Sequence, residues 1–535
     1  MGYGYDLDLG RLAQARLSRR GFLGAAAAAG VLAAAGRGNG GVHAAGTTRW
    51  STTPSLPTDP FTLGVASGDP LDDAVVLWTR LAPDPLVAGG GMPNGDVEVA
   101  WELLDDERDR VVDSGTALAA ADLGHSVHVD ARGLDPDRDY RYRFMVGDYE
   151  TPPARTRTAP ARGRGRRLRM GQVSCQMFDR GYYTAYADLA ADEDLDLVVH
   201  CGDYIYESAS GGDVRADPLP VAKTIDDYRA RYALYRSDAD LRAAHARCPW
   251  VVTWDDHEVE DNYHGTAAKS TSTTPDPSDF AARRAAAYRA WWEHMPVRFD
   301  PPDGPDLRIH RRLRWGRPAD LVVLDTRQYR SDQVCVEGSD IGPRCDAALE
   351  DDFTMLGARQ ERWLDRQLRA VDGNWTVLVQ GVSVMQWRFA PGNAVWNLDG
   401  WDGYPVARDR LMASLVDADA PNPVVLTGDV HSSWVGSLAE DFDDASARPV
   451  GTEHIAPGVT SPSAGLLRDA IPAVLDNSPH VRWAEAEHRG WVRHDVTPEE
   501  WRTEYRLVDD VSVPGGAVTV ASRWVTPAGG TVAEA

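Results

Sequence analysis

This sequence of 535 residues lacks several features that define common classes of protein. It has no run of about 20 apolar residues, the length that a membrane-spanning helix needs, and no internal repeat. Basic residues are also in short supply, since 56 Lys and Arg stand against 81 Asp and Glu and give a net charge of −25. A chain this acidic repels nucleic acid and anionic membranes, so we expect no nucleic-acid partner except as a possible substrate.

The N-terminus has the order of a twin-arginine export signal. Arg19 and Arg20 precede Gly-Phe-Leu and an apolar, Ala-rich run that is too short to span a membrane. Small residues around Ala44 then suit signal peptidase. We predict a signal peptide over residues 1–44, the twin-arginine export machinery as a partner, and a secreted protein without a transmembrane segment. An N-terminal anchor is the alternative.

Cysteine is scarce, with five residues in the whole chain. Cys201 and Cys248 lie inside or next to apolar runs, where we expect them to pack in the core. Cys335 and Cys345 stand ten positions apart in a segment rich in Gly, Pro and Asp. Since disulfides persist in exported proteins, we expect this pair to form one. The fifth cysteine, Cys175, directly follows a predicted strand over residues 170–174.

The chain is too long for one ordinary domain, and its pattern changes part-way. Residues 55–157 alternate β-forming runs with Asp-, Gly- and Pro-rich turns, which predicts a small all-β domain of the fibronectin III type with a structural role. Tyr140 is placed as the corner tyrosine of such a sandwich. Residues 158–167 are basic and Gly-rich, as linkers are.

Residues 168–520 predict a larger α/β domain. Apolar runs of four to six residues recur there, and such runs are typical of strands buried on both faces. Helical spacing appears between the runs, for example at Tyr228, Tyr232 and Tyr235, where we expect core packing. The sum predicts a layered β-sandwich flanked by helices.

Four of the apolar runs end in residue types that bind metals. In layered α/β domains, ligands bind beyond the carboxyl ends of the strands, so these side chains are expected to meet. They are Cys175 after residues 170–174, Asp203 and Tyr206 after residues 197–201, Asp256 and His257 after residues 250–254, and Asp429 and His431 after residues 423–427. A bound metal would also give this acidic chain the local positive charge that a phosphate ester needs.

The order and spacing of these elements resemble the calcineurin-like metallophosphoesterases, and more narrowly the PhoD-like alkaline phosphatases. The residues that carry the resemblance are Ser-Cys175-Gln, Gly-Asp203-Tyr-Ile-Tyr206-Glu, Trp-Asp-Asp256-His257-Glu and Gly-Asp429-Val-His431. Leu63-Gly-Val-Ala-Ser-Gly-Asp-Pro70 and Leu324-Asp-Thr-Arg-Gln-Tyr329 extend it over most of the chain. The resemblance implies a metallophosphoesterase fold and a phosphoric ester hydrolase.

The resemblance further implies a dinuclear centre. Its first metal would receive Cys175, Asp203, Tyr206 and His431, and the family places iron there. A hard trivalent ion such as Fe³⁺ suits the anionic phenolate and carboxylate, although ligand softness alone also allows Zn²⁺.

The second metal would receive Asp203 as a bridge, together with Asp256 and Asp429. Ligation by oxygen alone favours Ca²⁺, and Mn²⁺, Mg²⁺ and Zn²⁺ are the alternatives. The histidine that other branches supply before the last motif has no counterpart in residues 380–384.

For the reaction we expect hydroxide activated by the metals to attack phosphorus, so that no Ser or Asp nucleophile is needed. Asp203 and His257 are the predicted catalytic residues, with His257 contacting the transition state or protonating the leaving group. Asn262 and His264 are predicted to line the substrate pocket.

The predicted function is therefore a secreted, metal-dependent alkaline phosphatase and phosphodiesterase that acts on phosphate esters. Because PhoD-like proteins also include phospholipase D-type activities, a phosphodiesterase of choline phospholipids is one alternative. A non-enzymatic surface binding protein that uses the N-terminal β domain is the other.

Overall fold

A computed structural model describes residues 56, 58–269, 272, 274–336, 340–389, 395–444 and 446–535. The predicted export signal, residues 1–44, lies outside these residues. Within them, no helix combines the length and the apolar character that crossing a bilayer requires.

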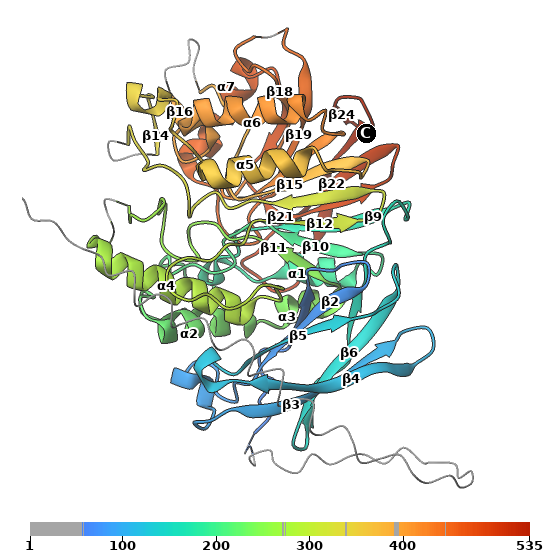
Figure 1. Cartoon of the computed structure of the whole chain (residues 1–535). Helices are drawn as coiled ribbons and strands as arrows, with labels where there is room; N and C mark the ends of the chain where they lie inside the picture. The colour runs from blue at the N-terminus through green and yellow to red at the C-terminus, as the bar shows by residue number, and fades with distance from the viewer. Residues whose placement is uncertain are drawn as a thin grey trace, which may run out of the picture. The chain divides into compact units, whose positions relative to one another are not determined.

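Two large β-sheets pack face to face in the α/β part of the chain (Figure 1). At the centre of the ten-stranded sheet are the parallel strands β9 (Leu168–Val173), β10 (Leu197–His200) and β11 (Trp250–Val252). At the centre of the seven-stranded sheet are the parallel strands β13 (Ala319–Val323), β15 (Trp375–Val379), β17 (Pro423–Thr427) and β19 (Pro449–Ile455). Most of these strands coincide with the predicted apolar runs, and the predicted mixed α/β fold is confirmed.

Antiparallel strands complete both sheets. The ten-stranded sheet continues through β21 (Arg489–Val496), β22 (Glu500–Val508), β23 (Val518–Pro527) and β24 (Ala533–Glu534). The seven-stranded sheet adds β12 (Arg311–Trp315), β18 (Ser433–Ala439) and β20 (Val481–Glu485). A separate pair joins β14 (Ile341–Gly342) to β16 (Trp396–Asn397).

Alternate residues of the central strands serve two different cores. Leu197 and Val199 pack between the sheets, in the same cluster as residues of β13, β15 and β17. Val198 lies between them in sequence and packs on the opposite face, against the helices. Because both faces of the strand are covered, neither set of positions needs to be polar, and the run is apolar throughout.

Helices cover the outer faces of the two sheets (Figure 1). Those on the ten-stranded sheet are α1 (Thr184–Ala191), α2 (Ile225–Arg236), α3 (Ala239–Arg247) and α4 (Pro277–His294). Those on the seven-stranded sheet are α5 (Gly357–Leu368), α6 (Pro405–Asp417) and α7 (Gly465–Asn477).

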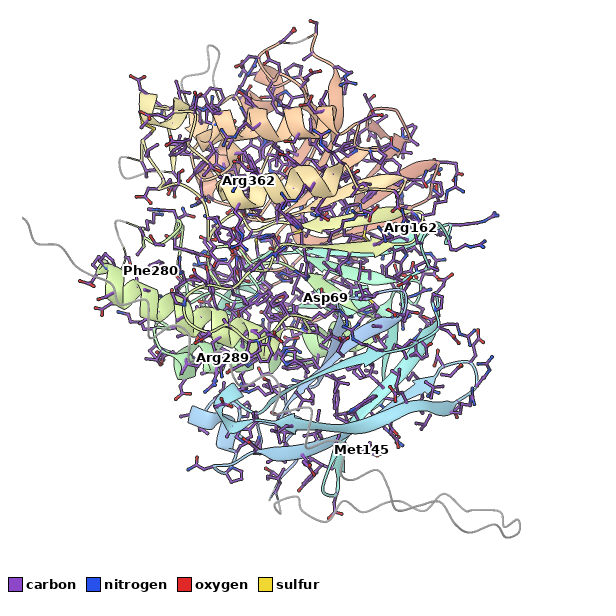
Figure 2. The ribbon with its side chains drawn as sticks, in the orientation of Figure 1. Asp69, Met145, Arg162, Phe280, Arg289 and Arg362 are labelled. Carbon is purple, nitrogen blue, oxygen red and sulfur yellow. A yellow bond between two sulfur atoms is a disulfide. The ribbon has the colours of Figure 1, made fainter. Side chains whose placement is uncertain are left out.

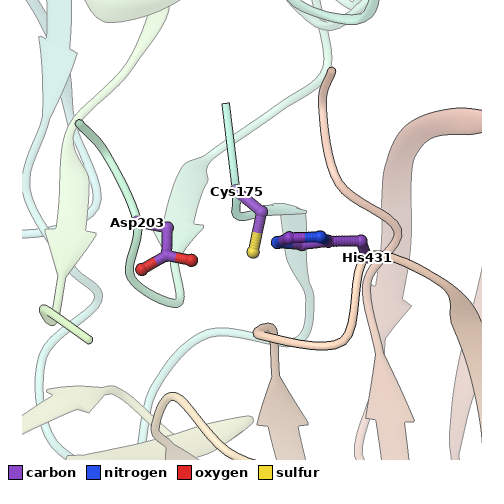
Figure 3. Close-up of side chains that lie close together, drawn as sticks. All are labelled: Cys175, Asp203 and His431. Carbon is purple, nitrogen blue, oxygen red and sulfur yellow. The ribbon is translucent and has the colours of Figure 1, made fainter. Parts of the chain in front are cut away.

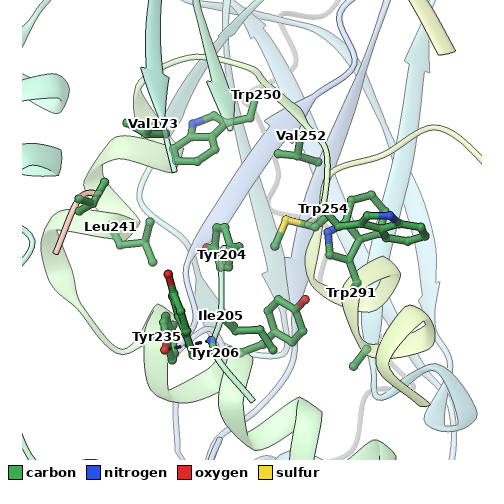
Figure 4. Packing of buried hydrophobic residues seen from close by; sticks show 14 of the residues in the cluster. Val173, Tyr204, Ile205, Tyr206, Tyr235, Leu241, Trp250, Val252, Trp254 and Trp291 are labelled. Carbon is green, nitrogen blue, oxygen red and sulfur yellow. Dashed lines mark hydrogen bonds between the residues drawn. The ribbon is translucent and has the colours of Figure 1, made fainter. Parts of the chain in front are cut away.

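Helix α2 shows why its segment is helical. Thr224 and Asp227 form a reciprocal capping box that satisfies two free backbone N–H groups at its start. The three tyrosines predicted to pack in the core, Tyr228, Tyr232 and Tyr235, are all buried. Tyr235 does more than pack, because its hydroxyl also accepts a hydrogen bond from the backbone N–H of Tyr206 at 3.1 Å (Figure 4).

The N-terminal β segment is built from two layers. One layer is a five-stranded sheet of β3 (Val97–Asp105), β4 (Arg110–Ala119), β6 (Asp139–Val146), β7 (Tyr149–Glu150) and β8 (Ala154–Arg157). The other is β1 (Val65–Gly68), β2 (Ala74–Arg80) and β5 (Ser126–Arg132), which form the far edge of the ten-stranded sheet. The hydroxyl of Tyr140 accepts from the backbone N–H of Asp135 at 3.0 Å, as expected of a corner tyrosine.

One residue pair joins the N-terminal strands to the central ones. Gly68 of β1 pairs in parallel with Trp250 of β11. A Cβ atom at position 68 would lie 2.4 Å from the carbonyl oxygen of Pro296, so only glycine fits. The next residue, Asp69, which Figure 2 labels, is buried. It accepts two hydrogen bonds from Arg311, at 2.7 and 3.0 Å. The N-terminal segment is therefore held to the α/β part by both a shared sheet and a buried ion pair.

Candidate metal centre

The loops that follow β9, β10 and β17 bring Cys175, Asp203 and His431 together (Figure 3). One potential ligand atom from each lies within 4.8 Å of the other two. Cys175 and Asp203 are fully buried, and His431 is half-buried. The three side chains come from positions up to 256 residues apart, and the carboxyl ends of the strands place them at one point, as the sequence predicted.

Four of the six predicted ligands have left-handed backbone conformations that residues other than glycine seldom adopt. The φ angles are 56° at Cys175, 57° at Asp203, 67° at Asp429 and 54° at His431. Each such residue costs about 1–3 kcal/mol and persists only where its surroundings fix it. Strain of this kind gathers at functional sites, and here it turns the side chains toward one another.

The Tyr206 hydroxyl has one proton to donate but lies close to two hydrogen-bond acceptors. It lies 3.1 Å from Oδ2 of Asp203 and 2.9 Å from Nε2 of His431, and it accepts from Ser461 at 2.8 Å. Nδ1 of His431 lies 3.0 Å from the carbonyl of Pro462, so Nδ1 carries the proton and Nε2 is an acceptor. One phenol proton cannot satisfy both acceptors, whereas a cation shared by the three groups would.

A second group of acidic side chains adjoins the first. Asp203, Asp256 and His257 form one potential ligand set, and Asp256 and Asp429 belong to another with Asp255. Within the part of the chain that the structure describes, Oδ1 of Asp203 and Oδ1 of Asp256 are buried without a hydrogen-bond partner. Since buried carboxylate oxygens are normally satisfied, these two atoms fit a site for a cation.

The electrostatics of the acidic groups agree with that fit. Burial and the neighbouring Asp256 raise the pKa of Asp203 well above its usual value, and burial and Asp399 do the same for Asp429. Burial also raises the pKa of the Cys175 thiol and of the Tyr206 phenol. Nearby cations favour the ionised forms of all four groups, so this donor set suits bound metal and is costly without it.

His257 lies at the edge of both groups. Its ring packs on the ring of Tyr206 at a centroid distance of 4.1 Å, and its Nδ1 lies 2.8 Å from Oε2 of Glu207. Burial opposes protonation, but the carboxylates of Asp256 and Glu207 outweigh it and raise the pKa of His257 above its usual value. A histidine held in its charged form can donate a proton.

The two predicted pocket residues differ in position. The backbone N–H of Asn262 donates to Asp256 at 2.6 Å, and its side-chain amide donates to Asp340 at 2.9 Å. His264 contacts a different carboxylate, with its Nδ1 3.2 Å from Asp332. Neither belongs to the groups of potential ligands, and a substrate contact for either one stays a prediction.

Two residues for which the sequence predicted no role, Glu258 and Arg327, contact the residues of the centre. Glu258 accepts from the backbone N–H groups of Asp203, Tyr204 and Asp255 at 3.1, 2.7 and 2.8 Å, and so ties the loops after β10 and β11 together. Arg327 is fully buried among acidic side chains. Arg327 lies four residues after the end of β13, within the segment 324–329, and that position was the available signal.

The other cysteines lie as predicted. Cys335 and Cys345 form a disulfide with a Cα–Cα distance of 5.5 Å. Cys201 and Cys248 are free thiols buried in apolar clusters.

Comparison with known proteins identifies the family. A family model described as PhoD-like phosphatase matches residues 170–505, and one for the N-terminal domain of PhoD-like phosphatases matches residues 47–160. The chain belongs to the PhoD-like phosphatase family. This family membership makes it a phosphoric ester hydrolase and sets aside the alternative of a non-enzymatic binding protein.

Individual relatives of this PhoD-like phosphatase agree. It is 44% identical to alkaline phosphatase D of Bacillus subtilis (strain 168) over 486 residues, which cover 89% of this chain and 82% of that protein. The solved structure of PhoD superposes with a TM-score of 0.85 at 42% identity, over 90% of this chain and 93% of that one. A purple acid phosphatase from yellow lupin shares the fold, with a TM-score of 0.54 at 12% identity over 88% and 75% of the two chains.

Proposed function

We propose that this PhoD-like phosphatase is a secreted alkaline phosphatase and phosphodiesterase that hydrolyses phosphate esters at a dinuclear metal centre. One observation carries the proposal: two adjoining sets of ligand-type side chains share the buried Asp203, and Oδ1 of that residue has no hydrogen-bond partner among the described residues. A buried carboxylate shared by both ligand sets would be compensated by cations held in them.

The two ends of the centre differ in chemistry. Cys175, Asp203, Tyr206 and His431 would hold the first ion, and their anionic thiolate, phenolate and carboxylate suit Fe³⁺.

The second ion would be held by oxygens alone, from Asp203, Asp256 and Asp429. Such a site favours Ca²⁺, while Mn²⁺ and Mg²⁺ would meet the same donors. When bound, the two ions would supply the Lewis acidity that neutralises phosphate oxygens and activates a water.

The chain itself supplies the acid. Because Nδ1 of His257 is bonded to Glu207, Nε2 is the nitrogen left to face a substrate. A cavity of about 360 Å³ adjoins His257, and its lining includes Glu207, Lys269 and Arg283. We place the leaving group at this cavity, where the imidazolium can protonate its oxygen as the bond to phosphorus breaks.

The remaining parts have supporting roles in this proposal. Residues 1–44 direct export by the twin-arginine route, and residues 55–157 form a fibronectin III-like structural domain. Residues 158–167 link it to the catalytic domain over residues 168–520. The corner hydrogen bond of Tyr140 and the two-layered packing of the N-terminal strands support the second of these assignments.

The decisive experiment compares Asp203→Asn with the unchanged enzyme on a phosphomonoester, a bis-aryl phosphodiester and phosphatidylcholine. We expect hydrolysis of the first two by the unchanged enzyme, and a loss of at least about 100-fold in the variant with reduced metal content. Asp148→Asn, at an exposed turn, is the matched control. Unchanged hydrolysis by Asp203→Asn would refute the metal centre, and a preference for phosphatidylcholine would refute the substrate class.

A further inference from the structure

Asp255 has the position of a metal ligand. It precedes Asp256 in the loop after β11, and one of its carboxylate oxygens lies within 4.8 Å of oxygens of Asp256 and Asp429. It is also fully buried. By distance alone it would be a third terminal carboxylate for the second metal, so the contacts of its two oxygens decide whether it is available.

Both oxygens of Asp255 are already taken by Arg327. Nε of Arg327 donates to Oδ1 at 2.5 Å, and Nη2 donates to Oδ2 at 3.0 Å, which is the forked geometry of a strong guanidinium–carboxylate pair. Gly381 provides the space for this pair, since a Cβ atom there would lie 2.4 Å from Oδ1 of Asp255. The Asp255 carboxylate is therefore held against the Arg327 guanidinium by both of its oxygens.

Arg327 is itself held in place from the other side. Nη1 and Nη2 donate to the two oxygens of Asp399 at 2.9 and 2.8 Å, and Arg330 donates to the same carboxylate at 2.8 Å. The side chains of both arginines are fully buried. This double fork leaves Arg327 no alternative position, which makes it a rigid neighbour of the metal centre.

The guanidinium also reaches the predicted ligands. Nη2 lies 3.5 Å from Oδ1 of Asp256 and 3.6 Å from Oδ1 of Asp429, longer than its bonds to Asp255 and Asp399. Its charge therefore acts on the two ligand carboxylates without occupying them. Oδ1 of Asp256 has no hydrogen-bond partner in the described ranges and stays open to a cation.

The charges of this buried cluster are incomplete without an ion. Four carboxylates, those of Asp255, Asp256, Asp399 and Asp429, face only two guanidinium groups. Asp203, which the second metal would share, adds a further carboxylate. Buried charges are stable when compensated, so this excess of carboxylates favours a bound cation.

We propose that Arg327 is a positioning residue that withholds Asp255 from the second metal. The inference rests on the dinuclear centre proposed above. It assigns Asp255 to the support of the site, although its distance to Asp256 and Asp429 is that of a ligand. The guanidinium has two effects: it removes one carboxylate from the ligand set, and it places a positive charge beside the two that remain.

The first test uses Asp255→Asn and Asp256→Asn as a matched pair of adjacent substitutions. Iron-loaded protein freed of other metals is titrated with Ca²⁺ by calorimetry. Asp255→Asn should bind Ca²⁺ within about fivefold of the unchanged enzyme, whereas Asp256→Asn should lose at least about tenfold. An equal loss in both variants would make Asp255 a ligand and overturn the inference.

The second test uses Arg327→Gln. Without the guanidinium, Asp255 can turn to the ion and a positive charge near the site is gone, so the affinity for Ca²⁺ should rise at least about tenfold while hydrolysis falls. A residue with a merely structural role would give the opposite sign, because a loosened site binds metal more weakly. A lower Ca²⁺ affinity in a folded Arg327→Gln therefore contradicts the inference, and if this variant does not fold, Asp255→Asn decides alone.

The two proposals fail in different ways. If the unchanged, iron-loaded enzyme takes up no divalent ion at all, the dinuclear centre is wrong and the role of Arg327 falls with it. If the unchanged enzyme binds one Ca²⁺ and Asp255→Asn loses it, the dinuclear centre stands and only the role of Arg327 is wrong.

Discussion

The hydroxyl of Tyr206 lies 2.9 Å from Nε2 of His431, a residue 225 positions further along the chain. The two side chains come from opposite sheets, one from the loop after β10 and the other from the loop after β17. Ser461 donates to the same hydroxyl, and Pro462 fixes the other ring nitrogen. The centre is therefore assembled across the interface of the two sheets, and its first metal would join them.

Tyr206→Phe should remove the phenolate ligand and leave the ring in place. We expect the activity to fall by at least about 100-fold, because loss even of a residue that only supports a ligand commonly costs 10–100-fold. Iron bound by a phenolate gives a visible charge-transfer band, so the purified variant should also lose that band in an absorption spectrum.

Tyr204→Phe is the control for this substitution. The hydroxyl of Tyr204 contacts His245 at 2.8 Å, away from the candidate ligands. Its loss should lower the free energy of unfolding by about 1 kcal/mol and leave the visible band intact. If Tyr206→Phe keeps its band, or the unchanged protein has none, then Tyr206 does not bind iron.

His257→Gln should affect substrates according to their leaving groups. An alkyl leaving group needs a proton as the bond to phosphorus breaks, so its hydrolysis should slow by about 10²–10⁴-fold. An activated aryl leaving group needs little help and should be affected much less. The measurement is kcat/KM for an alkyl and an aryl phosphate at one pH.

His488→Gln serves as the comparison, because His488 is exposed and contacts Glu485 rather than the candidate ligands. We expect it to leave the ratio of the two kcat/KM values unchanged. Equal losses on both substrates in His257→Gln would show that this histidine binds phosphate and does not act as the acid.

The sequence was sufficient to predict that the side chains following the central strands would lie close together. Cys175, Asp203 and His431 come directly after buried apolar runs, and the geometry of parallel strands brings such positions together. It was not sufficient for Arg327 and Asp399, which stand 72 residues apart, with Asp399 outside the central strands. Long-range pairs between loops leave no periodic pattern in a sequence.

The junction of the N-terminal segment was missed for a similar reason. The sequence predicts a β domain followed by a basic, Gly-rich linker, and it does not indicate that β1, β2 and β5 complete the ten-stranded sheet. That union depends on one pairing, Gly68 with Trp250, and on the absence of a side chain at position 68. Strand order across a sheet is not encoded in the local pattern of either strand.

The disulfide between Cys335 and Cys345 should stabilise the loop before α5. Closing a loop of this length restricts the unfolded chain and is worth about 2–3 kcal/mol. The double substitution Cys335→Ser and Cys345→Ser should therefore lower the Tm, measured by calorimetry. A reducing agent should lower the Tm of the unchanged protein and leave the Tm of the double variant unaffected. An equal fall of the Tm in both proteins would show that the reducing agent does not act through this disulfide.

His494 predicts how stability depends on pH. Its Nδ1 accepts from the indole N–H of Trp501 at 2.9 Å, so its Nε2–H donates to Gln172 at 2.9 Å and the ring is neutral. Burial, reinforced by His454, holds the pKa of His494 well below its usual value, because a second ring proton would face the indole N–H. Burial likewise lowers the pKa values of His200 and His454 to about 3.

In the unfolded chain these histidines take up protons below a pH of about 6.5, while in the folded protein they do not. Through these groups the unfolded state binds more protons, so their contribution to stability falls as the pH drops from about 6.5 toward about 3, by up to about 1.4 kcal/mol per pH unit for each group. His494→Gln should make the unfolding free energy depend less steeply on pH, and the change in slope should correspond to at most about one bound proton. The measurement is the free energy of unfolding in denaturant at several pH values after metal removal. An equally steep decline in His494→Gln would mean that His494 is already protonated in the folded protein.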